Sequence, residues 1–247
     1  MKRLIKVCTL IIGFLGFAVF IHERKPVELP QSFTESKKIA KQLFSNHQMT
    51  FYCGCQYDNQ GVVNWDSCGY KPKRNTNRAK FIEWEHIVPA HFFGKDLQCW
   101  KEPICRTKEG KSYKGRKCCQ KVNKAFIQME ADLHNLVPEI GELNAARSNY
   151  AFGLLPHIKT REFGACQIKI DTRSKLVEPR ARVRGTIARA YLYMSTTYKT
   201  PLTAQNFKLF RAWSGEHPPE KWEIEWNEKI SKIQGRTNSF IEIPKND

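Results

Sequence analysis

An adjacent carboxylate and imidazole, Glu85 and His86, are the side chains in this sequence best suited to hydrolytic chemistry. A neutral imidazole takes a proton from water near neutral pH, and a carboxylate is a hard oxygen ligand for a divalent cation. Neighbours on a strand point to opposite faces unless the strand bends, and Pro89 is a reason for such a bend. A Glu-His dipeptide alone is more often a surface feature, so the pair needs support from elsewhere in the chain.

A second segment, residues 132–144, supplies that support. It predicts an extended piece at 136–138, a turn, and a helix over 139–149. Asn144 on this helix offers a side-chain oxygen of the kind that Mg²⁺ accepts, although an Asn that caps a helix or turn is the alternative. A strand, a long loop, a second strand and a helix, with an ion between the first strand and the helix, form a known nuclease architecture.

Four separated motifs resemble the bacterial endonuclease I family, whose members are periplasmic or secreted nucleases without sequence preference and with a ββα-metal (His-Me finger) site. The motifs lie at residues 51–55, 83–90, 129–138 and 184–195. They occur in the family's order, and the match runs from about residue 33 to 235. The resemblance implies an α+β fold: a ββα-metal core within a mostly helical, disulfide-stapled single domain.

The resemblance also implies a role for individual residues. His86 matches the family's general base, and Glu85 matches its acidic metal ligand. Asn144 matches the second metal ligand, which implies one Mg²⁺ ion per site, replaceable by other divalent cations, and no small-molecule cofactor. Arg116 looks like the arginine that contacts the phosphate near the cleavage point, and Glu130 looks like its acidic neighbour. The implied activity is a metal-dependent endonuclease that acts on double- and single-stranded DNA and on RNA.

The elements that must position these residues follow from periodicity. A strand over 81–89 carries Glu85 and His86. Helices are predicted at 33–46, 125–133, 180–198, 203–213 and 222–233. The first of them begins with the pattern of a capping box, Ser32 to Glu35. Residues 94–124 have little periodicity but contain four cysteines, which indicates a loop held by cross-links. The mixture is α+β with helix in the majority.

The formal net charge of +17 implies an anionic partner such as nucleic acid. Solubility alone does not need so one-sided an excess. A non-enzymatic exported DNA-binding protein would also explain the charge, but it would give Glu85 and His86 no task. The helix predicted at 180–198 offers candidate phosphate contacts, with a solvated face as the alternative. These candidates are Arg180, Arg182, Arg184 and Arg189.

The first 22 residues have the pattern of an export signal, because Lys2, Arg3 and Lys6 precede an apolar run at 7–21. That run is shorter than a standard membrane span; an uncleaved anchor is the alternative. We therefore expect a signal at 1–22 and a single nuclease domain over 23–247. The expected product is a periplasmic or secreted monomer that has no membrane partner after signal cleavage.

Eight cysteines follow the signal, and an even number in an exported chain predicts up to four disulfides. They are Cys53, Cys55, Cys68, Cys99, Cys105, Cys118, Cys119 and Cys166. Zinc is disfavoured because the pairs at 53–55 and 118–119 lack the usual gap between zinc ligands. A cysteine hydrolase is disfavoured by the even count and by the lack of a Cys–His context. Within residues 94–124 we expect Cys99 to pair with Cys118, and Cys105 with Cys119.

Overall fold

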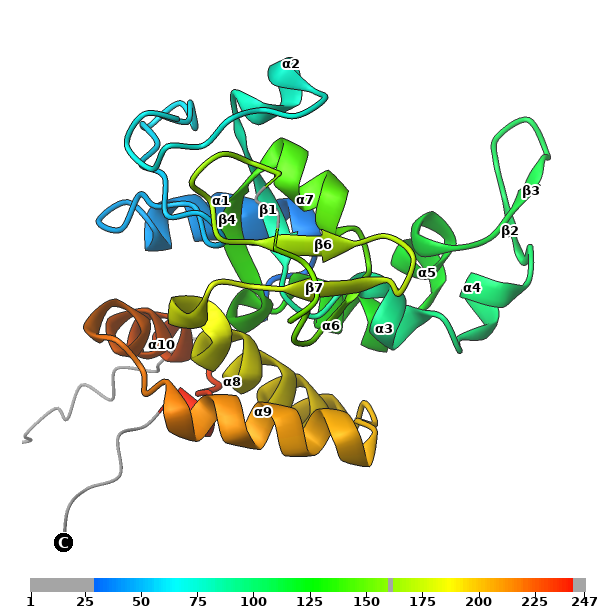
Figure 1. The fold of residues 1–247 in the computed structure, drawn as a ribbon. Helices are drawn as coiled ribbons and strands as arrows, with labels where there is room; N and C mark the ends of the chain where they lie inside the picture. Colours follow the sequence, from blue (N-terminus) through cyan, green and yellow to red (C-terminus); the bar gives the residue numbers. More distant parts are fainter. Residues whose placement is uncertain (1–28, 160–161, 242–247) are drawn as a thin grey trace, which may run out of the picture.

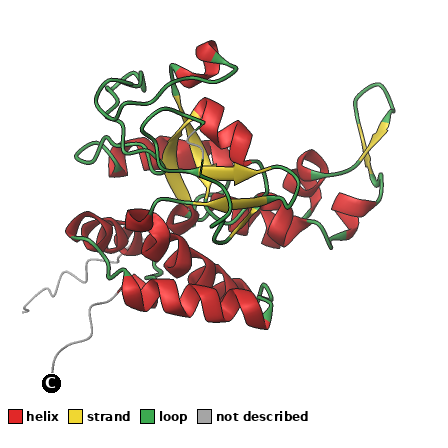
Figure 2. Ribbon diagram, in the orientation of Figure 1, coloured by secondary structure: helices red, strands yellow, loops and turns green. Residues whose placement is uncertain are grey.

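The computed structural model describes residues 29–159 and 162–241, and the signal predicted at 1–22 lies outside them. Helices and three small sheets fit one α+β domain (Figures 1 and 2). The α-helices are α1 (Phe33–Leu43), α2 (Thr76–Ala79), α3 (Ala90–Gly94), α4 (Gln98–Lys101), α5 (Arg116–Val122), α6 (Lys124–Ala131), α7 (Gly141–Arg147), α8 (Ala181–Tyr198), α9 (Ala204–Glu216) and α10 (Lys221–Gln234). The strands are β1 (Ile82–His86), β2 (Cys105–Arg106), β3 (Ser112–Tyr113), β4 (Leu136–Ile140), β5 (Ala151–Phe152), β6 (Lys169–Asp171) and β7 (Leu176–Glu178). Two 3-10 turns, η1 (Leu133–Asn135) and η2 (Ser239–Ile241), complete the described chain.

β1 and β4 form an antiparallel pair in which Glu85 lies opposite Val137 and His86 opposite Leu136. β4 is buried along its whole length, and α7 follows it without a loop. The order of strand, long connection, strand and helix is therefore the one expected from the sequence. α7 is shorter at both ends than predicted, and after Arg147 the residue Ser148 has a φ of 55°, which a helix cannot continue.

α8, α9 and α10 pack together and lie below the sheet of β5, β7 and β6 in the view of Figure 1. α8 is buried along most of its length, from Val183 to Met194. Its Tyr191 stacks on Phe210 of α9 with ring centroids 4.4 Å apart. The predicted helices at 180–198, 203–213 and 222–233 are confirmed to within three residues at each end.

α1 begins with the side-chain cap that the sequence predicts, because Ser32 Oγ accepts a hydrogen bond from the Glu35 N–H at 3.2 Å. The Glu35 carboxylate differs from a standard capping box: it accepts from the Gln31 N–H at 2.8 Å rather than from Ser32. The helix ends three residues before the predicted boundary, at Leu43. Its first residue, Phe33, packs against the catalytic candidate His86.

Residues 98–122, which we call the disulfide arm, project from the body at the right of Figure 1. The arm consists of α4, the hairpin of β2 and β3, and α5. Its disulfides are Cys99–Cys119 and Cys105–Cys118, so the pairing expected from the sequence was wrong. Consecutive residues of a helix point about 100° apart. On α5, Cys119 therefore reaches α4 while Cys118 reaches β2, and sequence spacing does not show which of the two faces which partner.

The remaining disulfides are Cys53–Cys166 and Cys55–Cys68. All eight cysteines predicted to be oxidised are thus cross-linked, and none is left to bind zinc. Cys53–Cys166 joins segments 113 residues apart and ties the region before β1 to the region before β6. Among the described residues, no helix has the length and apolar character needed to cross a membrane.

Candidate active site

A cleft of about 650 Å³ lies where β1, α5 and α7 meet. Glu85 and His86 line it from the end of β1. Arg116 lines it from the first residue of α5, and Asn144 from α7. The fold therefore brings together four of the five residues that the sequence singled out. The fifth, Glu130 near the end of α6, lies behind the cleft and bonds to Arg116 and His86.

The imidazole of His86 is held in one orientation. Its Nε2 lies 2.8 Å from the backbone carbonyl oxygen of Glu130. Because a carbonyl oxygen only accepts hydrogen bonds, Nε2 carries the proton and Nδ1 retains the lone pair. Burial lowers the pKa of His86 to about 3, and the charges of Arg116 and Arg147 add to this effect. His86 is therefore a neutral imidazole with Nδ1 as its proton acceptor.

Two side chains fix the backbone where β1 ends. Asn135 Nδ2 donates to the Val88 carbonyl oxygen at 2.9 Å, and Asn135 Oδ1 accepts from the Val88 N–H at 2.7 Å. Arg147 donates to the carbonyl oxygens of His86 at 3.0 Å and Ile87 at 2.6 Å. These bonds replace further strand pairing, so β1 stops three residues before its predicted end. They also hold the turn that follows Glu85 and His86.

Glu85 is a buried carboxylate, 4% exposed. Its Oε1 accepts a hydrogen bond from the Tyr52 hydroxyl at 2.8 Å and forms an ion pair with Arg147 Nη1 at 3.0 Å. Burial raises the pKa of Glu85, whereas Arg147 and Tyr52 lower it. Among the described residues, Oε2 receives no hydrogen bond. One oxygen is thus used to fix the carboxylate, and the other remains as an acceptor.

The guanidinium of Arg116 is held in place by a buried carboxylate, that of Glu130. Its Nε donates to Glu130 Oε1, and Gln120 Nε2 donates to the same carboxylate at 2.8 and 2.9 Å. The Glu130 side chain is 2% exposed, whereas that of Arg116 is 41% exposed. Arg116 Nη2 is buried with no hydrogen-bond partner among the described residues, so Nη1, which makes no hydrogen bond to those residues, is the group left for an anion. A guanidinium that is anchored at one edge and has spare N–H groups is suited to a phosphate.

Asn144 is oriented through its amide nitrogen, which donates to Glu83 Oε2 at 3.0 Å. Its amide oxygen therefore remains as an acceptor. Within the described ranges, no three or more His, Cys, Asp or Glu side chains cluster so as to hold a metal ion. A cation in this cleft would have Glu85 and Asn144 as protein ligands and would take further oxygens from water and substrate. Mg²⁺ is commonly bound in this way, so the donor set fits it.

The four α8-region arginines predicted to contact phosphate do not line this cleft. Each guanidinium bonds within the fold. The acceptors of Arg180, Arg182, Arg184 and Arg189 are, in order, the Phe51 carbonyl oxygen, Glu220, Glu178 and Glu223. Arg189 is 2% exposed and joins α8 to α10, which is a structural role. Among the three of them that form ion pairs, Arg182, Arg184 and Arg189, the side chain of Arg182 is the most exposed, at 60%.

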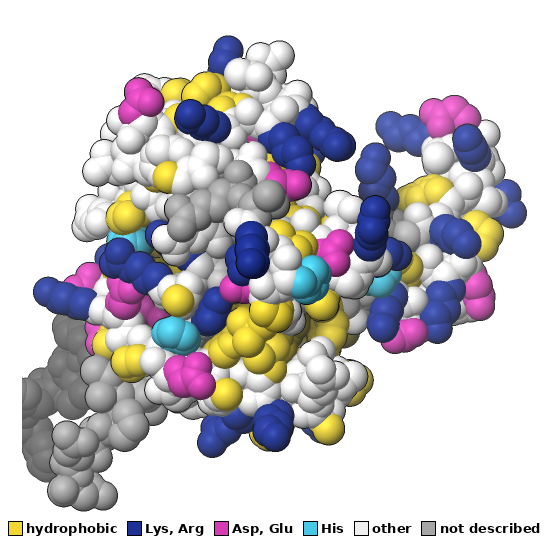
Figure 3. All heavy atoms as spheres, viewed as in Figure 1, with side chains coloured by type: hydrophobic (Ala, Val, Ile, Leu, Met, Phe, Trp, Pro, Cys, Tyr) yellow, Lys and Arg dark blue, Asp and Glu magenta, His cyan; other side chains and the backbone are white. Residues whose placement is uncertain are grey.

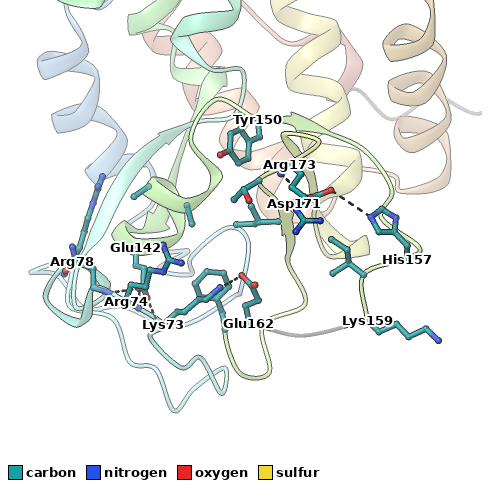
Figure 4. Close-up of a pocket in the computed structure, with 17 residues that line it drawn as sticks. Lys73, Arg74, Arg78, Glu142, Tyr150, His157, Lys159, Glu162, Asp171 and Arg173 are labelled. Carbon is teal, nitrogen blue, oxygen red and sulfur yellow. Dashed lines mark hydrogen bonds and ion pairs between the residues drawn. The ribbon is translucent and has the colours of Figure 1, made fainter.

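A second hollow, of about 940 Å³, adjoins the cleft and shares Arg78 with it (Figure 4). Some of the positive side chains that line this hollow are paired with acidic side chains that also line it. Lys73 forms an ion pair with Glu162 at 2.7 Å, and Glu142 accepts hydrogen bonds from the backbone N–H groups of residues 73–75. Glu142 thus holds the loop before β1. The carboxylate–imidazole pair lies in the smaller cleft and not in this hollow.

Sequence reasoning missed Tyr52, Glu139 and Arg147. Burial raises the pKa of Glu139 to about 8, and this carboxyl accepts a hydrogen bond from the Tyr52 N–H. Tyr52 in turn holds Glu85 through its hydroxyl. The signal for Arg147 was present, because residues three apart share a helical face and Arg147 follows Asn144 by three. Tyr52 and Glu139 support the site from outside the cleft, whereas Arg147 lines the cleft and holds Glu85 and the end of β1.

Comparison with known proteins identifies the family. The sequence profile of the family described as Endonuclease I matches residues 27–245. The chain is 42% identical to a periplasmic deoxyribonuclease of Aeromonas hydrophila, over 98% of each chain. It is 45% identical to an extracellular deoxyribonuclease of the same organism, over 87% of this chain and 92% of the relative. It is also 41% identical to Endonuclease-1 of Buchnera aphidicola, over 85% of this chain and 80% of the relative. The chain belongs to the Endonuclease I family.

Proposed function

We propose that this protein is an exported, metal-dependent endonuclease that hydrolyses DNA and RNA without regard to base sequence. The relatives named periplasmic or extracellular deoxyribonuclease support an exported enzyme that acts on DNA. Four disulfides are consistent with an oxidising compartment. The observation that carries the proposal is the neutral imidazole of His86, fixed in one tautomer beside Glu85, Arg116 and Asn144.

His86 is the general base of the proposed reaction. Its Nδ1 accepts a proton from a water molecule while the water oxygen attacks the phosphorus atom of the substrate. The bond between phosphorus and the leaving sugar oxygen then breaks, and that oxygen takes up a proton. The Glu130 carbonyl, which accepts the Nε2–H bond, keeps the ring from turning and stabilises the imidazolium that forms. A backbone carbonyl thus orients the His86 ring, which is the role that a carboxylate has in many other sites with a histidine base.

Glu85 and Asn144 would hold the metal ion, for which we propose Mg²⁺. When bound, the ion supplies positive charge at the phosphate and at the leaving oxygen. Arg147 and Tyr52 fix Glu85 Oε1 and leave Oε2 for the cation. Because the chain would contribute one carboxylate and one amide, phosphate oxygens of the substrate would be needed to complete the ligand set, which would favour binding of the metal together with nucleic acid.

Arg116 binds the phosphate that is cut. Its Nε is bonded to Glu130, so the guanidinium is already oriented before substrate arrives. The attacking oxygen comes from water and not from the substrate's 2′-hydroxyl, so the same residues act on DNA and on RNA. Contacts through the phosphate carry no sequence information, which is the physical reason to expect little base preference.

The test compares plasmid and RNA cleavage by the wild-type protein in EDTA, in EDTA followed by excess Mg²⁺, and by His86→Ala. We expect no cleavage in EDTA, recovery with Mg²⁺, and a loss of about 10²–10⁴-fold in His86→Ala with DNA binding retained. His91→Ala is the matched control, because His91 lines the same cleft but is exposed. Rapid cleavage by His86→Ala, or cleavage that persists in EDTA, would show that the mechanism is wrong.

A further inference from the structure

The disulfide arm carries eight Lys and Arg residues against two Glu. Figure 3 shows it as a projection whose surface is rich in Lys and Arg. Its fully buried residues are its four cysteines, so disulfides rather than an apolar core hold it. Gathering like charges on so small an element costs free energy unless a counter-charge is bound. This arrangement points to an anionic partner at the arm.

A hollow of about 660 Å³ runs along the arm, and we call it the arm groove. Arg116 lines its end, and no Asp or Glu lines it. Its other cations are Arg106, Lys108, Lys111, Lys114, Lys117 and Lys121. None of these six forms an ion pair with a carboxylate of the described residues. The hollow of Figure 4 differs, because three carboxylates accompany its cations.

The arm groove and the catalytic cleft share Arg116, which lines both. An anionic chain bound in the groove would therefore meet Arg116 and could continue into the cleft toward His86. A single small anion would use one or two of the groove's cations, whereas a chain of phosphates would use them all. Lysine dominates the groove, and its ammonium is a point charge that binds phosphate without fixing a base.

We propose that the arm groove binds the phosphate backbone of the nucleic acid strand that flanks the scissile phosphate. The identity of this partner rests on the proposed function, whereas the groove itself rests on its charges and its junction with the cleft. The groove supplies affinity for long substrates and aligns the strand with Arg116. Apart from Arg116, the residues of the groove take no part in the chemical step, so removal of its lysines leaves the hydrolysis of a small phosphodiester unchanged.

Binding is measured on the His86→Ala background, so that cleavage does not interfere. The arm variant replaces Lys108, Lys111, Lys117 and Lys121 by Gln; all four are exposed. The control variant replaces four exposed cations of α9 and α10 by Gln and changes the net charge equally. These are Lys208, Arg211, Lys229 and Lys232. We expect the arm variant to bind duplex DNA more than ~10-fold more weakly near 0.1 M salt and to lower the salt slope by about 3–4. We expect the control variant to change the slope by less than about 1.

Catalysis is measured separately with bis(p-nitrophenyl) phosphate, on proteins that retain His86. The arm variant should hydrolyse this small diester at the wild-type rate while it cleaves plasmid more slowly at low DNA concentration. If the wild-type protein hydrolyses neither substrate, the proposed function fails, but the binding result still decides the role of the arm. A loss of small-diester hydrolysis in the arm variant would place the lysines in the catalytic machinery and would overturn the proposal.

A protection experiment needs no arm variant. Lysines of the His86→Ala protein are reductively methylated with and without a bound duplex, and modified positions are located by mass spectrometry. We expect DNA to protect Lys108, Lys111 and Lys117 but not Lys208 or Lys229. Equal protection at both sets, or an unchanged salt slope in the arm variant, would overturn the proposal. So would loss of binding to phosphatidylglycerol vesicles without loss of DNA binding, which would assign the groove to a membrane.

Discussion

Replacement of Arg147 by Met tests whether this buried arginine holds the end of β1 and Glu85 in place. Arg147 is fully buried and ion-paired to Glu85, and it donates to the carbonyl oxygens of His86 and Ile87. Methionine is apolar and similar in length, so the main loss is the charge and its three contacts. Glu85 would then be a buried carboxylate with one remaining hydrogen bond, from Tyr52.

Breaking a buried ion pair by removing one partner costs about 3–5 kcal/mol, because the other charge stays buried without compensation. We expect this loss in the free energy of unfolding of Arg147→Met at pH 7. Adding Glu85→Gln removes the stranded charge, so the double variant should recover about 2–3 kcal/mol. Without Arg147, burial raises the pKa of Glu85 further. The folded state then binds a proton more tightly than the unfolded chain, and the deficit should shrink as pH falls below that raised pKa.

The assay is urea denaturation of the oxidised proteins in EDTA, which prevents metal binding at Glu85 from contributing. Arg182→Met is the control, because Arg182 and Glu220 form an ion pair with side chains 60% and 36% exposed. Loss of such an exposed pair costs about 0–1 kcal/mol. The role assigned to Arg147 would be refuted if the changes in unfolding free energy of Arg147→Met and Glu85→Gln were strictly additive in the double variant. It would also be refuted if Arg147→Met lost no more unfolding free energy than the control.

Three further outcomes are expected. Burial alone would raise the pKa of Asp132, but hydrogen bonds from His134, Gln234 and Tyr198 lower this pKa to about 2. The wild-type free energy of unfolding, measured by urea titration, should therefore fall by about 2 kcal/mol between pH 4 and pH 2. Asp132→Asn should lack this fall. Reduction of all disulfides by dithiothreitol should abolish plasmid cleavage, because the arm that carries Arg116 has no apolar core; full activity in a sample with free thiols confirmed by mass would contradict this. Sequenced fragment ends should show no strong base preference, whereas a sharp consensus would require contacts to base edges.

The sequence identified residues that line the candidate site, but it did not identify the residues that hold them in place. Glu85, His86 and Asn144 were found from residue type and motif, and the structure places them in one cleft. The larger helices were predicted because their apolar residues repeat with the helical period. The cap at Ser32 was predicted because its signature is local. Each of these features is determined by residues close together in the chain.

Features that join distant segments could not be predicted in the same way. The pairing of Cys118 and Cys119 depends on which side of α5 faces α4. Whether an arginine is buried or free to bind an anion depends on the groups that lie beside it in the fold. Arg189 donates to Glu223, 34 residues later in the chain, and is buried. Arg180, by contrast, meets the backbone of a segment 129 residues earlier. A count of positive charges therefore predicted the class of partner but not the surface that binds it.

The arm shows why charge and position must be considered together. Arg116 and Arg189 were both candidates for phosphate contact, and both form an ion pair with a glutamate. Arg189 and Glu223 are each about 2% exposed or less, so this pair is closed to any ligand. Arg116 is 41% exposed while Glu130 is 2% exposed, so the carboxylate fixes one edge of the guanidinium and leaves the other for an anion. The asymmetry of burial, rather than the presence of the ion pair, separates a structural arginine from one that can bind phosphate.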